Sequence, residues 1–183
     1  MTETTTLSPA IFLDRDGTLI EEVNFLSRVE DLRIFPFTRQ ALEELNAAGF
    51  RLFIVTNQSG IGRGHFTEDD MHNIHEALRK AFGGLITGFY YCPHLPTAGC
   101  DCRKPNTELI ERAASQHDID LSRSWFIGDK DLDIQTGVNA GIRTCLVLTG
   151  YGMEHKQTLG TMPTLIADNI GEAAREIITF LED

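Results

Sequence analysis

The stretch Ala10-Ile-Phe-Leu-Asp14-Arg-Asp16-Gly-Thr18 decides how this chain folds. Four apolar residues run without interruption into a carboxylate, and Gly17 follows three residues after it. A short continuous apolar run predicts a strand that is buried on both faces, and the glycine predicts a tight turn at its end. Asp14 and Asp16 are therefore expected at the mouth of a buried strand, where one carboxylate can attack an electrophile and the other can move a proton.

Strands and helices alternate along the rest of the chain. Apolar runs predict further strands at residues 51–55, 89–91, 125–127 and 144–148. Apolar positions at helical spacing predict helices over residues 37–48, between Thr67 and Gly83, from Asn106 onwards, before Gly141, and over 170–181. Because right-handed crossovers place helices outside a parallel sheet, this alternation predicts a three-layer α/β, Rossmann-like domain with a central parallel sheet.

Length and composition limit the possible functions. With 183 residues, 42% of them hydrophobic, the chain is expected to form one domain over residues 1–183. No apolar run approaches the roughly 20 residues that a membrane helix needs, and residues 1–6 lack the profile of a secretion signal. We therefore expect a cytoplasmic monomer with no membrane partner. The net charge of −11 repels a nucleic-acid backbone, which disfavours nucleic acid as a partner.

Reactive side chains recur where the predicted strands end. Thr56 and Asn57 follow the second strand, and Asp129 follows a later one. In an open parallel sheet, ligands bind beyond the carboxyl ends of the strands. The sequence therefore predicts a ligand site at this edge of the sheet, shared with Asp14 and Asp16.

Three of the four cysteines lie within eleven residues, beside a histidine. Cys92-Pro-His94 is followed after five residues by Cys100-Asp-Cys102. Three thiolates and one imidazole form a closed tetrahedral set that is typical of structural Zn²⁺. We predict a zinc-binding loop at residues 92–102; the alternative is a disulfide, which a reducing compartment disfavours. His72 and His75 have no such partners in the sequence and are interpreted as surface residues.

Four signatures of phosphate chemistry follow one another in a fixed order. They are Asp14 with Asp16, then Thr56, then Lys104, then Asp129 with Asp133. With these signatures the chain resembles the haloacid dehalogenase (HAD) superfamily of phosphohydrolases, from Ile11 to about Gly152. The resemblance implies an enzyme that depends on Mg²⁺ and forms an aspartyl-phosphate.

The resemblance also implies a role for the residues of these signatures. Asp14 would be the nucleophile, and Asp16 would protonate the leaving alcohol and then take a proton from water. Thr56 and Lys104 would hold the transferring phosphoryl group. Magnesium would be bound by the carboxylates of Asp14 and Asp129 and by the main-chain carbonyl of Asp16.

One branch of the superfamily shares two further features with this chain. About twenty residues separate Asp16 from the next predicted helix, which leaves no room for a cap domain, and Arg103-Lys-Pro105 directly follows the Cys/His loop. Both features are similar to the branch of the D,D-heptose 1,7-bisphosphate 7-phosphatases and the histidinol-phosphate phosphatases. The stretches that favour the heptose enzymes are Thr56-Asn-Gln-Ser-Gly-Ile-Gly-Arg-Gly64, Gly128-Asp-Lys130 and Leu148-Thr-Gly-Tyr-Gly152. The short spacer between His94 and Cys100 is nearer the histidinol enzymes.

This branch implies hydrolysis of the C7 phosphate of D-glycero-D-manno-heptose 1,7-bisphosphate, which supplies precursors of lipopolysaccharide. Arg103 would grip the second phosphate of the sugar, and Lys130 would add charge beside the metal. The other residues that the resemblance assigns to the sugar are Glu22, Val23, Asn24, Phe25, Asn57, Gln58 and Ser59.

Two alternatives stay open. Hydrolysis of histidinol phosphate would keep the same chemistry with another substrate. A non-catalytic phospho-receiver domain also joins an acceptor Asp to a Thr and a Lys, but its acceptor follows a middle strand and has no proton-transfer acid two residues further on. Asp16 therefore favours an enzyme.

Overall fold

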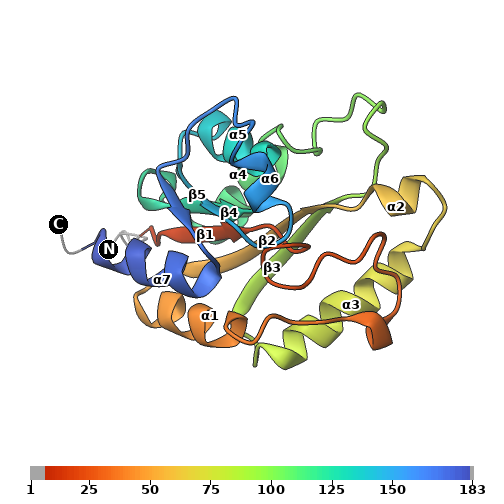
Figure 1. The fold of residues 1–183 in the computed structure, drawn as a ribbon, viewed down its shortest axis with the longest axis horizontal. Helices are drawn as coiled ribbons and strands as arrows, with labels where there is room; N and C mark the ends of the chain where they lie inside the picture. Colours follow the sequence, from red (N-terminus) through yellow and green to blue (C-terminus); the bar gives the residue numbers. More distant parts are fainter. Residues whose placement is uncertain (1–6, 182–183) are drawn as a thin grey trace, which may run out of the picture.

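The apolar run ahead of Asp14 forms strand β1 (Ala10–Leu13) in the computed structural model, which describes residues 7–181 (Figure 1). It pairs in parallel with β2 (Arg51–Asn57) on one side and with β4 (Trp125–Gly128) on the other. Further out lie β3 (Ile86–Cys92), β5 (Arg143–Val147) and β6 (Leu165–Ala167), so that the parallel sheet has the order β3-β2-β1-β4-β5-β6. The register pairs Leu13 with both Ile54 and Ile127, so β1 and β4 end within one residue of each other and β2 continues three residues further, to Asn57.

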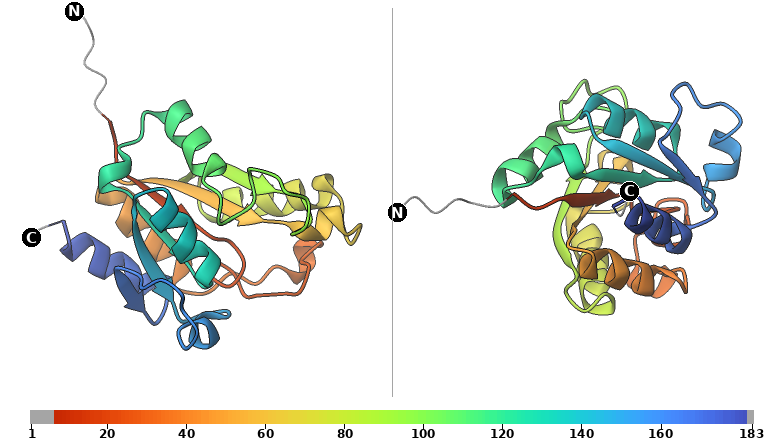
Figure 2. Two further views of the ribbon diagram at one scale, coloured as in Figure 1. Left: turned by 90° about the horizontal axis from the view of Figure 1, so that it is seen from above. Right: turned by 90° about the vertical axis from the view of Figure 1, so that its left-hand side faces the viewer.

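Helices cover both faces of the sheet and confirm the three-layer prediction (Figure 2). One face carries α1 (Thr38–Ala47), α3 (Glu68–Ala81) and α7 (Ile170–Thr179), and the other carries α4 (Glu108–His117) and α5 (Asp131–Asn139). Two single turns, α2 (Ser59–Gly62) and α6 (Gly152–His155), follow β2 and β5. The 3-10 helices are η1 (Val29–Asp31) and η2 (Leu121–Arg123).

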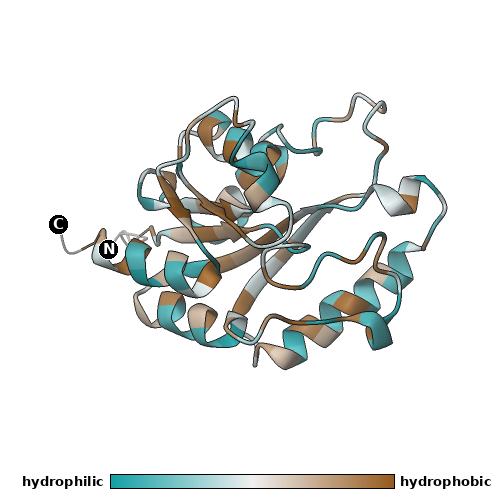
Figure 3. Ribbon diagram, in the orientation of Figure 1, coloured by the Kyte–Doolittle hydropathy of each residue, from teal (hydrophilic) through white to brown (hydrophobic). Residues whose placement is uncertain are grey.

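Alternating side chains of each strand fill two apolar layers. Ile11 and Leu13 pack toward α1, α3 and α7, whereas Ala10 and Phe12 pack toward α4. All four side chains are fully buried. Figure 3 shows the apolar strands between helices whose outer faces are hydrophilic. Burial on both faces is the reason that β1 has a continuous apolar sequence.

Some elements differ from the prediction in their bounds, and one strand of the sheet was missed. The helix expected from Asn106 begins at Glu108, and the Asn106 amide donates to the carbonyl of Cys100 instead of capping the helix. Strand β3 begins at Ile86, three residues before the predicted strand. Strand β6 was not predicted, because three residues are too few for a periodic pattern.

The segment between β1 and α1 contains no cap domain, as predicted. Residues 14–37 hold only the short helix η1 and fold back on themselves, with Gly17 N donating to Ile20 O and Ile20 bridging to Ile34. The edge of the sheet beside Asp14 is therefore covered by loops. Within residues 7–181, none of the helices has the length and apolar content needed to cross a membrane.

Candidate active site

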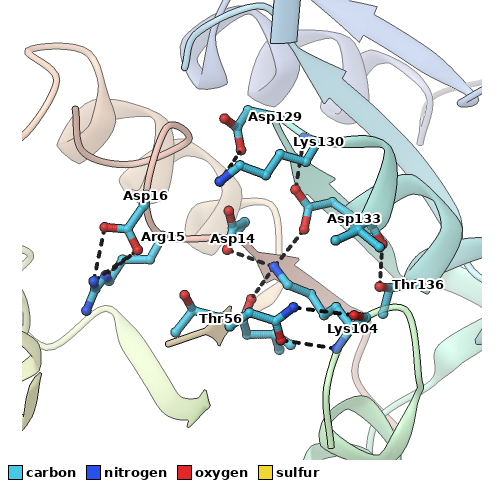
Figure 4. Close-up of polar contacts among 12 residues, drawn as sticks. Asp14, Arg15, Asp16, Thr56, Lys104, Asp129, Lys130, Asp133 and Thr136 are labelled. Atoms are coloured by element: carbon cyan, nitrogen blue, oxygen red, sulfur yellow. Dashed lines mark hydrogen bonds and ion pairs between the residues drawn. The ribbon is translucent and has the colours of Figure 1, made fainter. Parts of the chain in front are cut away.

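The carboxyl ends of the middle strands bring the predicted phosphate-chemistry residues together. Asp14 follows β1, Thr56 lies near the end of β2, Asp129 follows β4, and Lys104 reaches them from the loop before α4 (Figure 4). A cavity of about 280 Å³ opens at this edge. Its lining includes every residue that the sequence assigned to catalysis or to the sugar. The fully buried Asp129 lies outside this lining.

The ammonium group of Lys104 joins two buried carboxylates. Its Nζ donates to Asp14 Oδ1 at 2.8 Å, to Asp133 Oδ1 at 2.6 Å and to the carbonyl of Val55 at 3.1 Å. Burial lowers the pKa of Lys104, but the two carboxylates outweigh burial and raise it above its ordinary value. Burial raises the pKa of Asp14, but the positive charges of Lys104 and Lys130 lower it by more, so the net shift is downward. Asp14 is therefore an ionised carboxylate at neutral pH, as a nucleophile must be.

Asp129 is a buried carboxylate with one unused oxygen. Its Oδ2 accepts a hydrogen bond from Tyr151 N at 2.8 Å, whereas Oδ1 has no hydrogen-bond partner within residues 7–181. Burial, followed by the charge of Asp14, raises the pKa of Asp129 to about 8. One oxygen each of Asp14, Asp129 and Asp133 lies within 4.8 Å of the others. A hard cation would satisfy these oxygens, so the residues fit Mg²⁺.

Two glycines make room for the Asp129 carboxylate. A Cβ atom on Gly17 or on Gly150 would lie 2.2 Å from Asp129 Oδ2. Both glycines also have positive φ angles, of 85° and 55°. Any larger residue at either position would therefore be strained and would collide with the carboxylate.

Asp16 is paired with Arg15 beside this cluster (Figure 4). Arg15 Nε donates to Asp16 Oδ2 and Nη2 donates to Oδ1, both at 3.0 Å. Gln58 Nε2 donates to the same Oδ2 at 2.9 Å and to Thr56 Oγ1 at 2.8 Å. The Gln58 amide thus orients two residues that the sequence assigned to catalysis.

Arg15 and His75 contact this site but were not predicted from the sequence to do so. Arg15 is 1% exposed, and its Nη1 lies 3.3 Å from His75 Nε2. His75 was predicted to lie at the surface, but it is only 5% exposed and stacks on Phe89 with 4.7 Å between ring centroids. The signal that could have found it is its place next to Ile74 on the apolar face of α3.

Acid should destabilise the protein through His75. Burial, followed by the charge of Arg15, lowers the pKa of His75 to about 3, against about 6.5 in an unfolded chain. Below pH 6.5 the unfolded chain takes up a proton that the folded protein does not, so stability is complete above pH 6.5 and is lost as the pH falls toward 3. At pH 5 the loss in the free energy of unfolding is about 2 kcal/mol.

Urea unfolding at pH 8 and pH 5 measures this loss. His75→Phe should lose about 2 kcal/mol less than the wild type between the two pH values. His72→Phe replaces an exposed histidine on the same helix, whose charge is a smaller cause of the His75 shift than burial and Arg15, and should lose almost as much stability as the wild type. Equal losses in all three proteins would contradict a neutral, buried His75.

Several residues assigned to the sugar also contact one another. Lys130 Nζ lies 3.1 Å from Glu22 Oε2 and 4.0 Å from Asp129 Oδ1. Asn57 Oδ1 accepts a hydrogen bond from Lys104 N at 3.1 Å, so this side chain fixes the loop that carries Lys104. The rest of the predicted sugar-facing set in the lining is Val23, Asn24, Phe25, Ser59 and Arg103.

The Cys/His loop brings its four predicted ligands together. Cys100 Sγ lies 3.6 Å from both Cys92 Sγ and Cys102 Sγ, and His94 Nδ1 lies 3.5 Å from Cys92 Sγ and 3.2 Å from Cys102 Sγ. A disulfide needs about 2.0 Å between sulfurs, so none forms here, and the cysteines are free thiols. A tetrahedral ion with Zn–S bonds of about 2.3 Å has edges of about 3.8 Å, close to the observed spacings. The four donors therefore fit Zn²⁺.

Known proteins are similar in sequence to this chain over most of its length. A family model described as HAD-hydrolase-like matches residues 101–173. The chain is 39% identical over 190 residues to the D-glycero-D-manno-heptose-1,7-bisphosphate 7-phosphatase of Thermosynechococcus vestitus, which covers 94% of this chain and 97% of that protein. It is also 39% identical over 148 residues to the D-glycero-beta-D-manno-heptose-1,7-bisphosphate 7-phosphatase of Helicobacter pylori, covering 79% and 85%.

Solved structures that are similar to this fold also include heptose bisphosphate phosphatases. The crystal structure of D,D-heptose 1,7-bisphosphate phosphatase from B. bronchiseptica, complexed with magnesium and phosphate, superposes with a TM-score of 0.88. The two proteins are 29% identical, and the match covers 94% of this chain and 99% of that one. The corresponding enzyme from Burkholderia thailandensis superposes with a TM-score of 0.70 at 26% identity, covering 96% and 99%.

Proposed function

Since the chain belongs to the HAD-like hydrolases, among the heptose-1,7-bisphosphate 7-phosphatases, we propose that it hydrolyses the C7 phosphate of D-glycero-D-manno-heptose 1,7-bisphosphate. One observation carries the reaction: the ionised Asp14, held by Lys104 at 2.8 Å, lines a cavity that also contains Arg103 and Lys130. Phosphoryl transfer needs such a nucleophile with positive charge around it. The names of the relatives support the sugar bisphosphate and favour neither histidinol phosphate nor a receiver domain.

Two half-reactions follow from these residues. In the first, an oxygen of Asp14 attacks phosphorus, the bond from phosphorus to the C7 oxygen breaks, and Asp16 gives its proton to that oxygen. In the second, Asp16 takes a proton from a water molecule that attacks the acyl phosphate, which releases inorganic phosphate and restores the Asp14 carboxylate. Thr56 and Lys104 hold the phosphoryl oxygens in both steps.

The carboxylates of Asp14 and Asp129 and the main-chain carbonyl of Asp16 would hold the Mg²⁺ that such a reaction uses. When bound, the cation screens the repulsion between the Asp14 carboxylate and the anionic phosphate. Support comes from Asp129 Oδ1, which accepts no hydrogen bond within residues 7–181 and has only the Lys130 ammonium, at 4.0 Å, as a positively charged neighbour. Asp133 contributes indirectly, because it binds Lys104 Nζ and accepts a hydrogen bond from Lys130 N at 3.0 Å.

Phosphate release from three substrates tests the proposed function. Both anomers of the heptose bisphosphate and histidinol phosphate are compared in the presence of Mg²⁺. We expect the kcat/KM of one heptose anomer to exceed that of histidinol phosphate by about 100-fold or more. A preference for histidinol phosphate would contradict the substrate but not the reaction, whereas no release from any of them would contradict the reaction itself.

Arg103→Ala should weaken recognition of the second phosphate. Arg103 lines the cavity and donates one hydrogen bond to the carbonyl of His94 at 3.4 Å, which leaves other N–H groups of its fork for a phosphate. We expect the KM for the bisphosphate to rise by about 10- to 100-fold, with kcat within about threefold. Arg103→Lys keeps the charge without the fork and should give an intermediate KM.

Heptose 7-phosphate, which lacks the second phosphate, is the control substrate for Arg103→Ala. In steady-state assays, the KM of Arg103→Ala for this substrate should differ from the wild-type KM by less than about twofold. An equal rise in KM for both sugars would contradict a role in recognising the second phosphate.

We also propose that Cys92, His94, Cys100 and Cys102 hold a structural Zn²⁺. The donor spacings of 3.2 to 3.6 Å support it. Elemental analysis should find zinc in the wild type and none in Cys100→Ser, and the Tm of this variant should be lower by on the order of 10 °C. Cys145→Ser changes a buried cysteine outside the loop and should retain zinc. Full zinc content in Cys100→Ser would contradict the site.

We further infer that the protein acts as a monomer in the cytoplasm. The residues that the proposed reaction uses come together within this chain, so the chemistry requires no second copy. The net charge of −11 supports the expectation that nucleic acid is not a partner. Light scattering of the purified protein tests the oligomeric state.

A further inference from the structure

A buried line of polar side chains joins Asp16 to helix α3. The Asp16 carboxylate pairs with Arg15, and Arg15 Nη1 lies 3.3 Å from Nε2 of His75 on α3. Arg15 and His75 are 1% and 5% exposed. A buried guanidinium and a buried imidazole are costly to desolvate, and the half-reactions proposed above use neither of them.

The hydrogen bonds leave one oxygen of Asp16 available. Oδ2 accepts from Arg15 Nε at 3.0 Å and from Gln58 Nε2 at 2.9 Å and also lies 2.9 Å from Arg15 Nη2, whereas Oδ1 accepts only from Arg15 Nη2, at 3.0 Å. Each carboxylate oxygen has two lone pairs, so Oδ1 retains one. The Asp16 side chain is 15% exposed and lines the cavity. The Arg15 fork and the Gln58 amide together therefore decide which oxygen of Asp16 is free to exchange a proton.

His75 holds the other corner of the Arg15 guanidinium. Two nitrogens of this group, Nε and Nη2, are engaged by Asp16 and Gln58, and Nη1 is left for His75. A neutral imidazole can accept from Nη1 at Nε2 when its proton is on Nδ1, whereas a charged imidazole would repel the guanidinium. His75 is itself held by Phe89 on β3, with 28° between the rings. Contacts between neighbouring side chains thus connect Phe89 on β3, through His75 and Arg15, to Asp16.

We propose that Arg15 and His75 are positioning residues that hold the Asp16 carboxylate with Oδ1 available to the substrate. The inference rests on the proposed function, because it takes Asp16 as the group that protonates the C7 oxygen. If His75 lacked its acceptor nitrogen, one N–H of Arg15 would be buried without a partner. The guanidinium would then turn toward another acceptor, and the Asp16 carboxylate would turn with it.

Two replacements of His75 separate hydrogen bonding from packing. His75→Phe keeps a ring against Phe89 but has no acceptor, and His75→Gln has an acceptor oxygen but no ring. We expect His75→Phe to lower kcat and kcat/KM for the heptose bisphosphate by about 10- to 100-fold, with KM within about twofold. His75→Gln should restore kcat to within about threefold of the wild type. His72→Phe, at an exposed position on α3, is the matched control and should retain wild-type rates.

The leaving group gives a readout that a purely structural role would not move. A sugar alkoxide must be protonated as it leaves, whereas 4-nitrophenolate leaves without a proton. With 4-nitrophenyl phosphate as the substrate, kcat/KM covers the steps up to phosphorylation of Asp14, so His75→Phe should lower this ratio by less than about threefold. Equal losses on both substrates, wild-type rates in His75→Phe, or the same loss in His75→Gln as in His75→Phe would overturn the proposal.

A crystal structure of His75→Phe gives a test that needs no substrate. We expect the Asp16 carboxylate to rotate away from its position in the wild type. An unchanged Arg15–Asp16 pair in a folded His75→Phe protein would overturn the proposal. Failure of the wild type to release phosphate from the heptose bisphosphate would instead contradict the proposed function, and the crystal structure would still decide whether His75 holds the pair.

Discussion

Replacing Asp14 by asparagine should lower the kcat for the heptose bisphosphate by about 10⁴-fold or more, because an amide cannot form the acyl phosphate. The fold should tolerate the change. The charge of Asp14 raises the pKa of Asp129 and of Asp133, so its removal relieves repulsion between buried carboxylates. Lys104 also keeps its 2.6 Å contact with Asp133. Initial rates of phosphate release measure the loss, and the thermal midpoint checks that the variant is folded.

Mass spectrometry of acid-quenched protein distinguishes the nucleophile from the proton-transfer group. Asp16→Asn retains the nucleophile and should accumulate a phosphoryl group on Asp14 when it is mixed with 4-nitrophenyl phosphate, since no base then activates water. Asp14→Asn should carry no phosphoryl group with any substrate. A phosphorylated Asp14→Asn protein would contradict Asp14 as the attacking residue.

Lys104→Met should reduce both activity and stability. We expect kcat/KM to fall by about 10²- to 10³-fold, because the transferring phosphoryl group loses its nearest ammonium. The variant also leaves the carboxylates of Asp14 and Asp133 buried without their shared partner. Breaking a buried pair in this way costs about 3–5 kcal/mol, which corresponds to a Tm lower by roughly 6–20 °C in a domain of this size. Calorimetry and steady-state kinetics measure the two effects separately.

A double variant separates the loss of stability in Lys104→Met from its loss of activity. Lys104→Met combined with Asp133→Asn removes one of the two stranded carboxylates and should recover about half of the lost stability. It should recover none of the activity, because the phosphoryl group still lacks its ammonium. A Lys104→Met protein with the Tm of the wild type would contradict the stabilising role of the ion pairs, and an active double variant would contradict the role in catalysis.

The parts of the fold that rest on local patterns could be predicted from the sequence. Strand β1 is buried on both faces, so its position appears as an apolar run that ends at Asp14. Thr67 was predicted to cap a helix, and its side chain does accept a hydrogen bond from Asp70 N. The Cys/His loop was found because its four donors lie within eleven residues. In each case the deciding interactions are made by residues that are close in sequence.

The buried polar network could not be predicted, because distant residues decide it. Arg15 lies between two aspartates and has the sequence pattern of a solvated charge. Its burial depends on Gln58, 43 positions away, and on His75, 60 positions away. Asn106 misled for a related reason, because the carbonyl of Cys100 competes for the side chain that would otherwise cap the helix. Such competition between partners is settled only by the tertiary fold.

The central place of β1 in the sheet affects how the protein is made on the ribosome. Strand β1 lies between β2 and β4, and Asp129 at the end of β4 is synthesised 115 residues after Asp14. At about 5–20 residues per second, the ribosome needs roughly 6–23 s to add that length. Throughout this interval the nascent chain has Asp14, the proposed nucleophile, without Asp129, the proposed metal ligand, and an apolar strand with one unpaired edge. Phosphatase activity should therefore appear only after β4 has emerged, and until then the growing chain depends on protection of that edge.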